Sequence, residues 1–128
     1  MRRSLSVYSC ARISRTRLWD KGDAAALDPE KLKLQPQWVD TPDTRAALCR
    51  YYAEAQYFDD QVGTVDRLLL ETGRSADTMW TVLTEQGSIL PGAKWTCYEQ
   101  GLRVGMLVRW PGVVAPARSC RPWWTMWM

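Results

Sequence analysis

Three polar side chains within residues 78–113 have types and spacing that could do chemistry: Glu85, Gln86 and Lys94. Glu85 and Gln86 follow a short apolar run, and a carboxylate beside an amide offers two oxygen ligands to a hard divalent cation such as Ca²⁺. Lys94 follows in a loop opened by a Pro-Gly pair, where an ammonium group near a bound cation could hold an anionic ester oxygen. Taken alone, the Glu-Gln pair is what a solvated turn usually carries, and Lys94 could equally be a surface lysine.

A long amphipathic helix is predicted before these residues, over residues 41–72. Thr41 can cap it, Pro42 suits its first position and Gly73 ends it. Residues 19–40 are polar and interrupted by prolines, so a surface connection is expected there. Apolar residues recur in the helix at spacings of three and four, so one stripe should face a core: Leu48, Tyr51, Tyr52, Ala55, Val62, Val65, Leu68 and Leu69.

Two strands are predicted around the three polar side chains. Residues 78–84 are β-branched and aromatic and favour a buried strand, and a second strand over about residues 104–110 stops at a Pro-Gly pair. Helix, strand, polar loop and strand in this order are typical of an α/β sheet. Ligands collect at the carboxyl ends of strands in such sheets, which is where Glu85 and Gln86 would lie.

Charge is distributed unevenly along the chain. Residues 19–116 hold all 14 acidic residues and ten of the 17 Lys and Arg, a local charge of −4, whereas the two ends carry seven arginines and no acid. No known motif or platform of interleaved aromatic residues accompanies these arginines, so no nucleic-acid partner is expected.

Cysteine and apolar content narrow the class of protein further. The four cysteines form no CxxC pair and the chain has no histidine, which argues against a zinc site and favours free thiols. No segment approaches the roughly 20 apolar residues of a membrane span. Residues 1–11 imitate a signal peptide only faintly, so a cytoplasmic protein is the default expectation.

Four motifs together resemble the sulfatase family of the alkaline-phosphatase-like superfamily. They are YYAEAQYFDDQVG at residues 51–63, TVLTEQGS at 81–88, GAKWTCYEQGLRV at 92–104 and LVRWPG at 107–112, in the order and spacing of that family. The likeness is strongest with bacterial sulfatases of the heparan N-sulfatase type. It covers most of residues 19–116 and implies a partial alkaline-phosphatase-like α/β domain there.

The resemblance also implies roles for the three polar side chains. In sulfatases the residues after this strand help to bind the active-site Ca²⁺, so Glu85 and Gln86 match metal ligands, although many members have Asp followed by Asn or His. The lysine after the loop contacts the substrate sulfate, and Lys94 matches it. The implied substrate is a sulfated sugar or an aryl sulfate.

The nucleophile of that chemistry has no counterpart in the chain. In the family a formylglycine hydrate, made from the Cys or Ser of a C/S-x-P-x-R motif, attacks sulfur. The segment CRPWW at residues 120–124 imitates the motif, but Trp124 stands where arginine is required and the segment follows the metal residues. The histidines used by such sites are absent as well. We therefore expect a chain with sulfatase features that is not by itself a competent enzyme.

The two ends are interpreted as translated out of frame, over residues 1–18 and 117–128, leaving residues 19–116 as the partial sulfatase domain. Trp and Met have single codons, so WWTMWM at residues 123–128 determines nearly all of its nucleotides. Two bases later they encode Val-Asp-x-Val-Asp, which resembles the LVDYVDVLPT segment that follows the last motif in sulfatases. A similar shift over residues 7–16 permits the family's histidine-containing segment. A disordered segment is the alternative for residues 1–18.

Two other functions stay open. A fragment of a related metal-dependent phosphodiesterase would share the sheet, although the Lys94 loop and the LVRWPG strand favour sulfatases. A small non-catalytic module could instead bind a partner or a membrane surface through a basic, Trp-rich tail made of Arg118, Arg121, Trp123, Trp124 and Trp127. If the chain is a fragment of a sulfatase or of a phosphodiesterase, its apolar helix face and its strands lack the larger sheet that would cover them. Marginal stability and aggregation are then expected.

Overall fold

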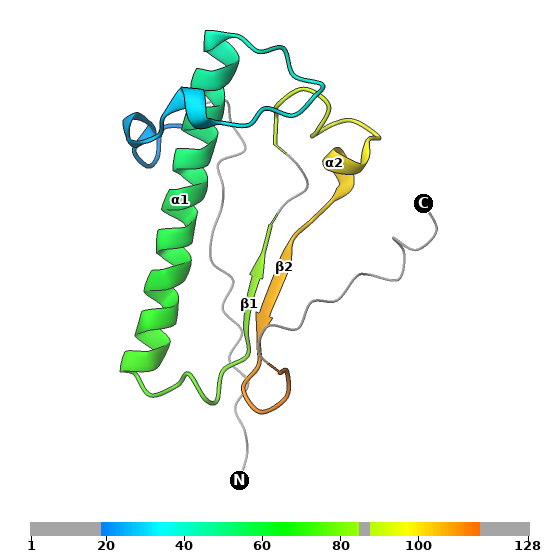
Figure 1. The fold of residues 1–128 in the computed structure, drawn as a ribbon. Helices are drawn as coiled ribbons and strands as arrows, with labels where there is room; N and C mark the ends of the chain where they lie inside the picture. The colour runs from blue at the N-terminus through cyan, green and yellow to red at the C-terminus, as the bar shows by residue number, and fades with distance from the viewer. Residues whose placement is uncertain (1–18, 85–87, 116–128) are drawn as a thin grey trace.

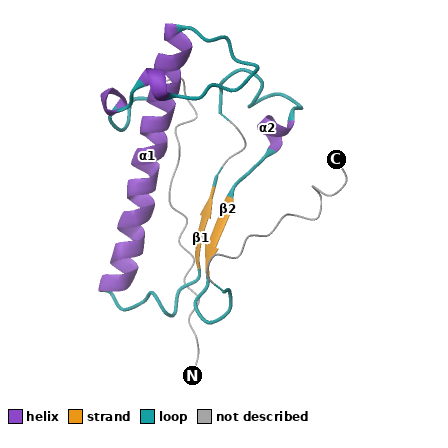
Figure 2. Ribbon diagram, viewed as in Figure 1, coloured by secondary structure: helices purple, strands orange, loops and turns teal. Residues whose placement is uncertain are grey.

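The structure, a computed structural model, describes residues 19–84 and 88–115. In chain order these residues form two 3-10 helices, η1 (Ala24–Ala26) and η2 (Pro29–Lys31), the long helix α1 (Pro42–Glu71), strand β1 (Trp80–Leu83), the short helix α2 (Glu99–Leu102) and strand β2 (Met106–Arg109). Helix α1 stands beside the two strands (Figure 1), and one loop joins the end of α1 to β1 (Figure 2). The architecture is thus a mixture of one long helix and a two-stranded sheet.

Helix α1 begins and ends at signals that are local in the sequence. At its start, the Thr41 side chain accepts a hydrogen bond from the Thr44 N–H at 3.1 Å. At its end, Gly73 adopts a φ of 68°, and the N–H groups of Gly73 and Arg74 donate to carbonyl oxygens of the last turn in a Schellman pattern. The helix predicted over residues 41–72 is therefore confirmed.

The first half of α1 is buried by the segment that precedes it. Both η1 and η2 contact α1, and the Trp19 ring meets Tyr51 edge to face with ring centroids 5.4 Å apart. Gly22 approaches so closely that a Cβ there would lie 2.1 Å from the Ala53 carbonyl oxygen. Residues 19–40 lie at the surface, as expected, since none of their side chains is buried, and they also pack against the first half of α1.

The predicted apolar stripe of α1 is buried in part. Leu48 is 1% exposed, whereas Tyr52 and Leu68 are 39% and 52% exposed. The other members of the stripe are partly buried: Tyr51, Ala55, Val62, Val65 and Leu69. Spacing along a helix defines which residues share a face, but burial depends on a second element lying against that face. In the described part of the chain, η1 and η2 supply that element only near the start of α1.

Strands β1 and β2 pair antiparallel, with Trp80 opposite Arg109 and Leu83 opposite Met106. Each is shorter than predicted, and the side chain of Thr84 explains one boundary. The Thr84 N–H donates to the Gly105 carbonyl at 2.9 Å, but the Gly105 N–H returns its bond to Thr84 Oγ1 at 2.6 Å instead of to the backbone. The side chain thereby replaces the next rung of the ladder and ends the sheet.

Both faces of the two-stranded sheet are substantially exposed. Met106 and Leu107, whose side chains point to opposite faces, are 61% and 70% exposed, and Leu83 of β1 is 62% exposed. The prediction of a buried strand over residues 78–84 is therefore correct in part: the strand spans Trp80–Leu83, its first three residues are partly buried, and Leu83 is exposed. Two strands with one neighbouring helix cannot bury both faces of a sheet.

Candidate functional site

Of the three residues predicted to form a site, the structure describes Lys94, while Glu85 and Gln86 lie outside the described residues. Because β1 and β2 are antiparallel, the connection of residues 84–105 leaves and returns at the same end of the sheet. Lys94 lies near the middle of this connection and is half-buried. It is therefore in a loop between the two strands, as predicted.

Hydrogen bonds on both sides of Lys94 hold its backbone in place. The Lys94 N–H donates to the Ser88 carbonyl at 2.8 Å, and the Leu90 N–H donates to Ser88 Oγ at 3.2 Å. Thr96 donates to the Ala93 carbonyl twice, from its N–H at 3.1 Å and from its Oγ1 at 2.6 Å. The lysine side chain therefore starts from a well-defined point of the loop.

The loop packs closely against α2 beside Lys94. Ala93 is 5% exposed, and a Cβ on Gly101 would lie 2.3 Å from the Ala93 carbonyl oxygen and 2.8 Å from that of Thr96. Any side chain at Gly101 would separate α2 from the loop. Trp95, the residue after Lys94, has a φ of 66° and an 84% exposed side chain, so the chain reverses here in a conformation that few residues other than glycine adopt.

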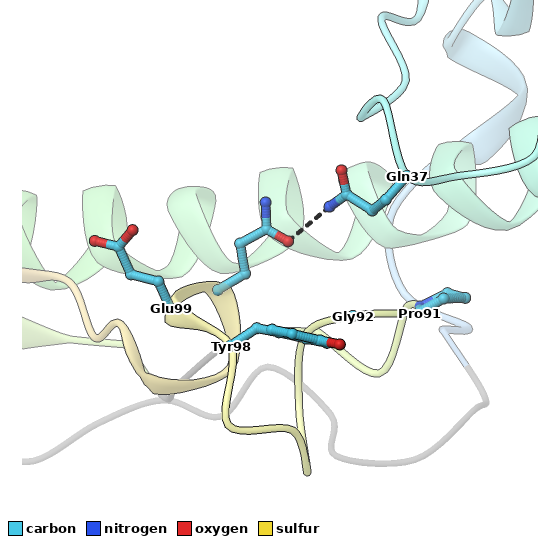
Figure 3. Close-up of a pocket in the computed structure, with 6 residues that line it drawn as sticks. Gln37, Pro91, Gly92, Tyr98 and Glu99 are labelled. Atoms are coloured by element: carbon cyan, nitrogen blue, oxygen red, sulfur yellow. Dashed lines mark hydrogen bonds between the residues drawn. The ribbon is translucent and has the colours of Figure 1, made fainter.

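Two side chains from the segment before α1 fasten the loop at both of its ends. Trp38 Nε1 donates to the Pro91 carbonyl at 2.8 Å, and Gln37 Nε2 donates to Gln100 Oε1 at 2.7 Å (Figure 3). Sequence reasoning missed both residues, because their partners are 53 and 63 residues away. The available signal was a tryptophan in an otherwise polar segment.

Arg45 of α1 holds that segment in turn. Its guanidinium donates to the two carboxylate oxygens of Asp40 at 2.6 and 2.8 Å and to the Pro29 carbonyl at 2.6 Å. These hydrogen bonds lower the pKa of Asp40 below its ordinary value, and Asp40 raises the pKa of Arg45. Contacts therefore run without a break from α1, through residues 35–40, to the Lys94 loop.

The connection of residues 84–105 carries two basic side chains, Lys94 and Arg103, and two acidic ones, Glu85 and Glu99, so its net charge is zero. Glu99 forms an ion pair with Arg103 one turn further along the chain. The charge of Glu99 is thereby neutralised by its own neighbour.

The described residues contain no group of three or more His, Cys, Asp or Glu that could hold a metal ion. The predicted Ca²⁺ ligands Glu85 and Gln86 lie outside the described residues. Cys49 and Cys97 are free thiols, the first buried and the second exposed. Among the helices that the structure describes, none is long and apolar enough to cross a membrane.

Comparisons with known proteins yield no match to the chain among protein-family models, curated proteins or solved structures. The sulfatase interpretation therefore depends on the four sequence motifs.

Proposed function

We propose that residues 19–116 are part of a sulfatase, a Ca²⁺-dependent hydrolase of sulfuric esters that uses a formylglycine, and that Lys94 is its sulfate-binding side chain. One observation carries the proposal. Four family-like motifs follow one another in sulfatase order within residues 51–112, and Lys94 is the single lysine between the two strand motifs. Glu85 and Gln86 would supply oxygen ligands to the Ca²⁺.

The fixed backbone of the loop supports this role for Lys94. The Lys94 N–H is hydrogen-bonded to Ser88, and the loop is fastened to Gln37 and Trp38, so the lysine side chain projects from a fixed base. A cation held in a constant place is what stabilisation of an anionic ester oxygen requires.

We further propose that the chain binds a sulfate ester without cleaving it. Attack on sulfur needs a formylglycine hydrate, and the sequence contains neither a C/S-x-P-x-R motif nor a histidine. Cation ligands and a lysine can polarise the ester, but they cannot replace a covalent nucleophile.

Binding and turnover of 4-nitrophenyl sulfate by the full chain in the presence of Ca²⁺ test both proposals. We expect binding without release of nitrophenol. Lys94→Ala should weaken binding roughly 10- to 150-fold, because a hydrogen bond to a charged group contributes roughly 1.5–3 kcal/mol. Lys33→Ala, which removes an exposed lysine from the segment before α1, should leave it unchanged.

Two results would contradict the proposals separately. Turnover that Lys94→Ala abolishes would show that the chain is a competent enzyme. Equal binding by Lys94→Ala and the unaltered chain would remove Lys94 from the sulfate site. Loss of the Ca²⁺ dependence of binding in Glu85→Ala or Gln86→Ala is expected if these residues hold the cation.

A further inference from the structure

An open pocket lies beside the Lys94 loop, between segments that are far apart in the sequence (Figure 3). Its volume is about 560 Å³, within the range of small-molecule sites. It is lined by Gln37, Pro91, Gly92, Tyr98, Glu99 and Gln100. The hydrogen bonds that fasten the loop to residues 37 and 38 also fix the relative positions of these walls.

Two amide groups form the polar wall of the pocket. The bond from Gln37 Nε2 to Gln100 Oε1 orients both side chains while using one N–H and one lone pair. The carbonyl oxygen of Gln37 and the NH₂ group of Gln100 keep further acceptor and donor capacity. An ordered donor beside an ordered acceptor matches the hydroxyl groups of a polyol, since each hydroxyl both donates and accepts.

Tyr98 supplies an apolar face opposite these amides. Its side chain is 69% exposed and extends from the start of α2 toward Gly92 and Pro91 (Figure 3). An exposed aromatic ring can pack against the C–H face of a flat ring, and its hydroxyl can hydrogen-bond at the rim. One apolar face and one amide wall suit a ring that is apolar on its flat side and polar around its edge.

The charge of the pocket disfavours an ionic ligand within it. Glu99 is the charged residue of the lining, and its carboxylate is paired with Arg103. An anion would meet a carboxylate without a lining cation, and a cation would compete with Arg103. An uncharged, hydroxylated ring meets neither cost.

We propose that this pocket is a subsite for an uncharged sugar ring, with Tyr98 as its stacking face and Gln37 and Gln100 as its hydroxyl-binding groups. The further idea that this sugar carries the sulfate ester bound by Lys94 rests on the proposed function. Lys94 follows Gly92 by two residues, so its Cα atom lies within about 7 Å of the Cα atom of a residue that lines the pocket.

Methyl glucoside and its 6-sulfate, titrated separately into the full chain and followed by saturation-transfer NMR, test the subsite. Both should bind, and Tyr98→Ala should weaken both at least fivefold. Gln100→Ala should weaken both as well, in case the loss of Tyr98 disturbs the loop. Trp95→Ala is the matched control, since it removes an 84% exposed aromatic ring of the same loop that does not line the pocket. Helix content by circular dichroism should be equal in all variants.

The outcomes separate this inference from the proposed function. No binding of methyl glucoside, or equal binding by Tyr98→Ala, would overturn the sugar subsite. A proline-rich peptide that binds with the same Tyr98 dependence while the glucoside does not would overturn it in favour of a peptide groove. If the glucoside binds but its sulfate gains no affinity that Lys94→Ala removes, the subsite stands and the sulfate role of Lys94 fails.

Discussion

Replacing Gly101 with alanine should destabilise the Lys94 loop more than the same change at Gly92 or Gly105, the other glycines that the structure describes in residues 88–105. The added Cβ would lie 2.3 Å from the Ala93 carbonyl oxygen, 2.8 Å from the Thr96 carbonyl oxygen and 3.0 Å from Thr96 Oγ1. Two of these contacts are with backbone atoms that no rotamer change can move. Overpacking of this kind costs about 1–3 kcal/mol.

Gly63→Ala provides the matched control, because it adds the same methyl group to open space. Gly63 lies inside α1, and no atom is within 4 Å of the position of its added Cβ. Alanine in a helix interior is favoured over glycine by about 0.8–1 kcal/mol. Gly101→Ala should therefore lower the free energy of unfolding of the chain, and Gly63→Ala should raise it. The difference between the two variants should be roughly 2–4 kcal/mol.

Urea unfolding followed by circular dichroism at 222 nm measures both changes, with the slope checked for constancy. Gly101→Ala should also weaken binding of 4-nitrophenyl sulfate, since α2 and the backbone next to Lys94 must separate. A midpoint for Gly101→Ala equal to that of the unaltered chain, together with a raised midpoint for Gly63→Ala, would refute the close seating of α2 on the loop.

Three further changes have defined outcomes. Trp38→Phe removes the N–H donor to Pro91 and should lower the free energy of unfolding by about 1 kcal/mol while speeding amide exchange in the loop, measured by NMR. Asp40→Asn should lower stability at neutral pH. Because Arg45 depresses the pKa of Asp40, this stabilisation is present above the ordinary aspartate pKa and is lost as pH falls through the lower folded value, so acid should bring the two unfolding midpoints together. Leu107→Lys, at a 70% exposed position of a sheet edge, should reduce light scattering by concentrated protein and change the unfolding free energy by less than about 0.5 kcal/mol.

The bounds of α1 could be predicted because its signals lie within a few residues of each end. Thr41 caps its first turn and Gly73 closes its last turn whatever surrounds them. The end of the sheet depended instead on Thr84 Oγ1 taking the Gly105 N–H, a contact across 21 residues that no local propensity encodes. Burial of the apolar stripe of α1 also depended on a distant contact, because residues 19–40 pack against only part of the helix.

The position of Lys94 could be predicted from the local sequence, but the residues that hold its loop in place could not. Its place in a loop follows from one contiguous motif, whereas Gln37 and Trp38 belong to none of the four motifs. Both hold the loop from one short segment, at Pro91 before the lysine and at Gln100 after it. A loop fixed at both ends to one segment must move with that segment, and Arg45 ties the segment to α1 through Asp40 and Pro29. Substitutions at Arg45 should therefore be felt at Lys94, whereas substitution of an exposed residue of β2 such as Leu107 should not.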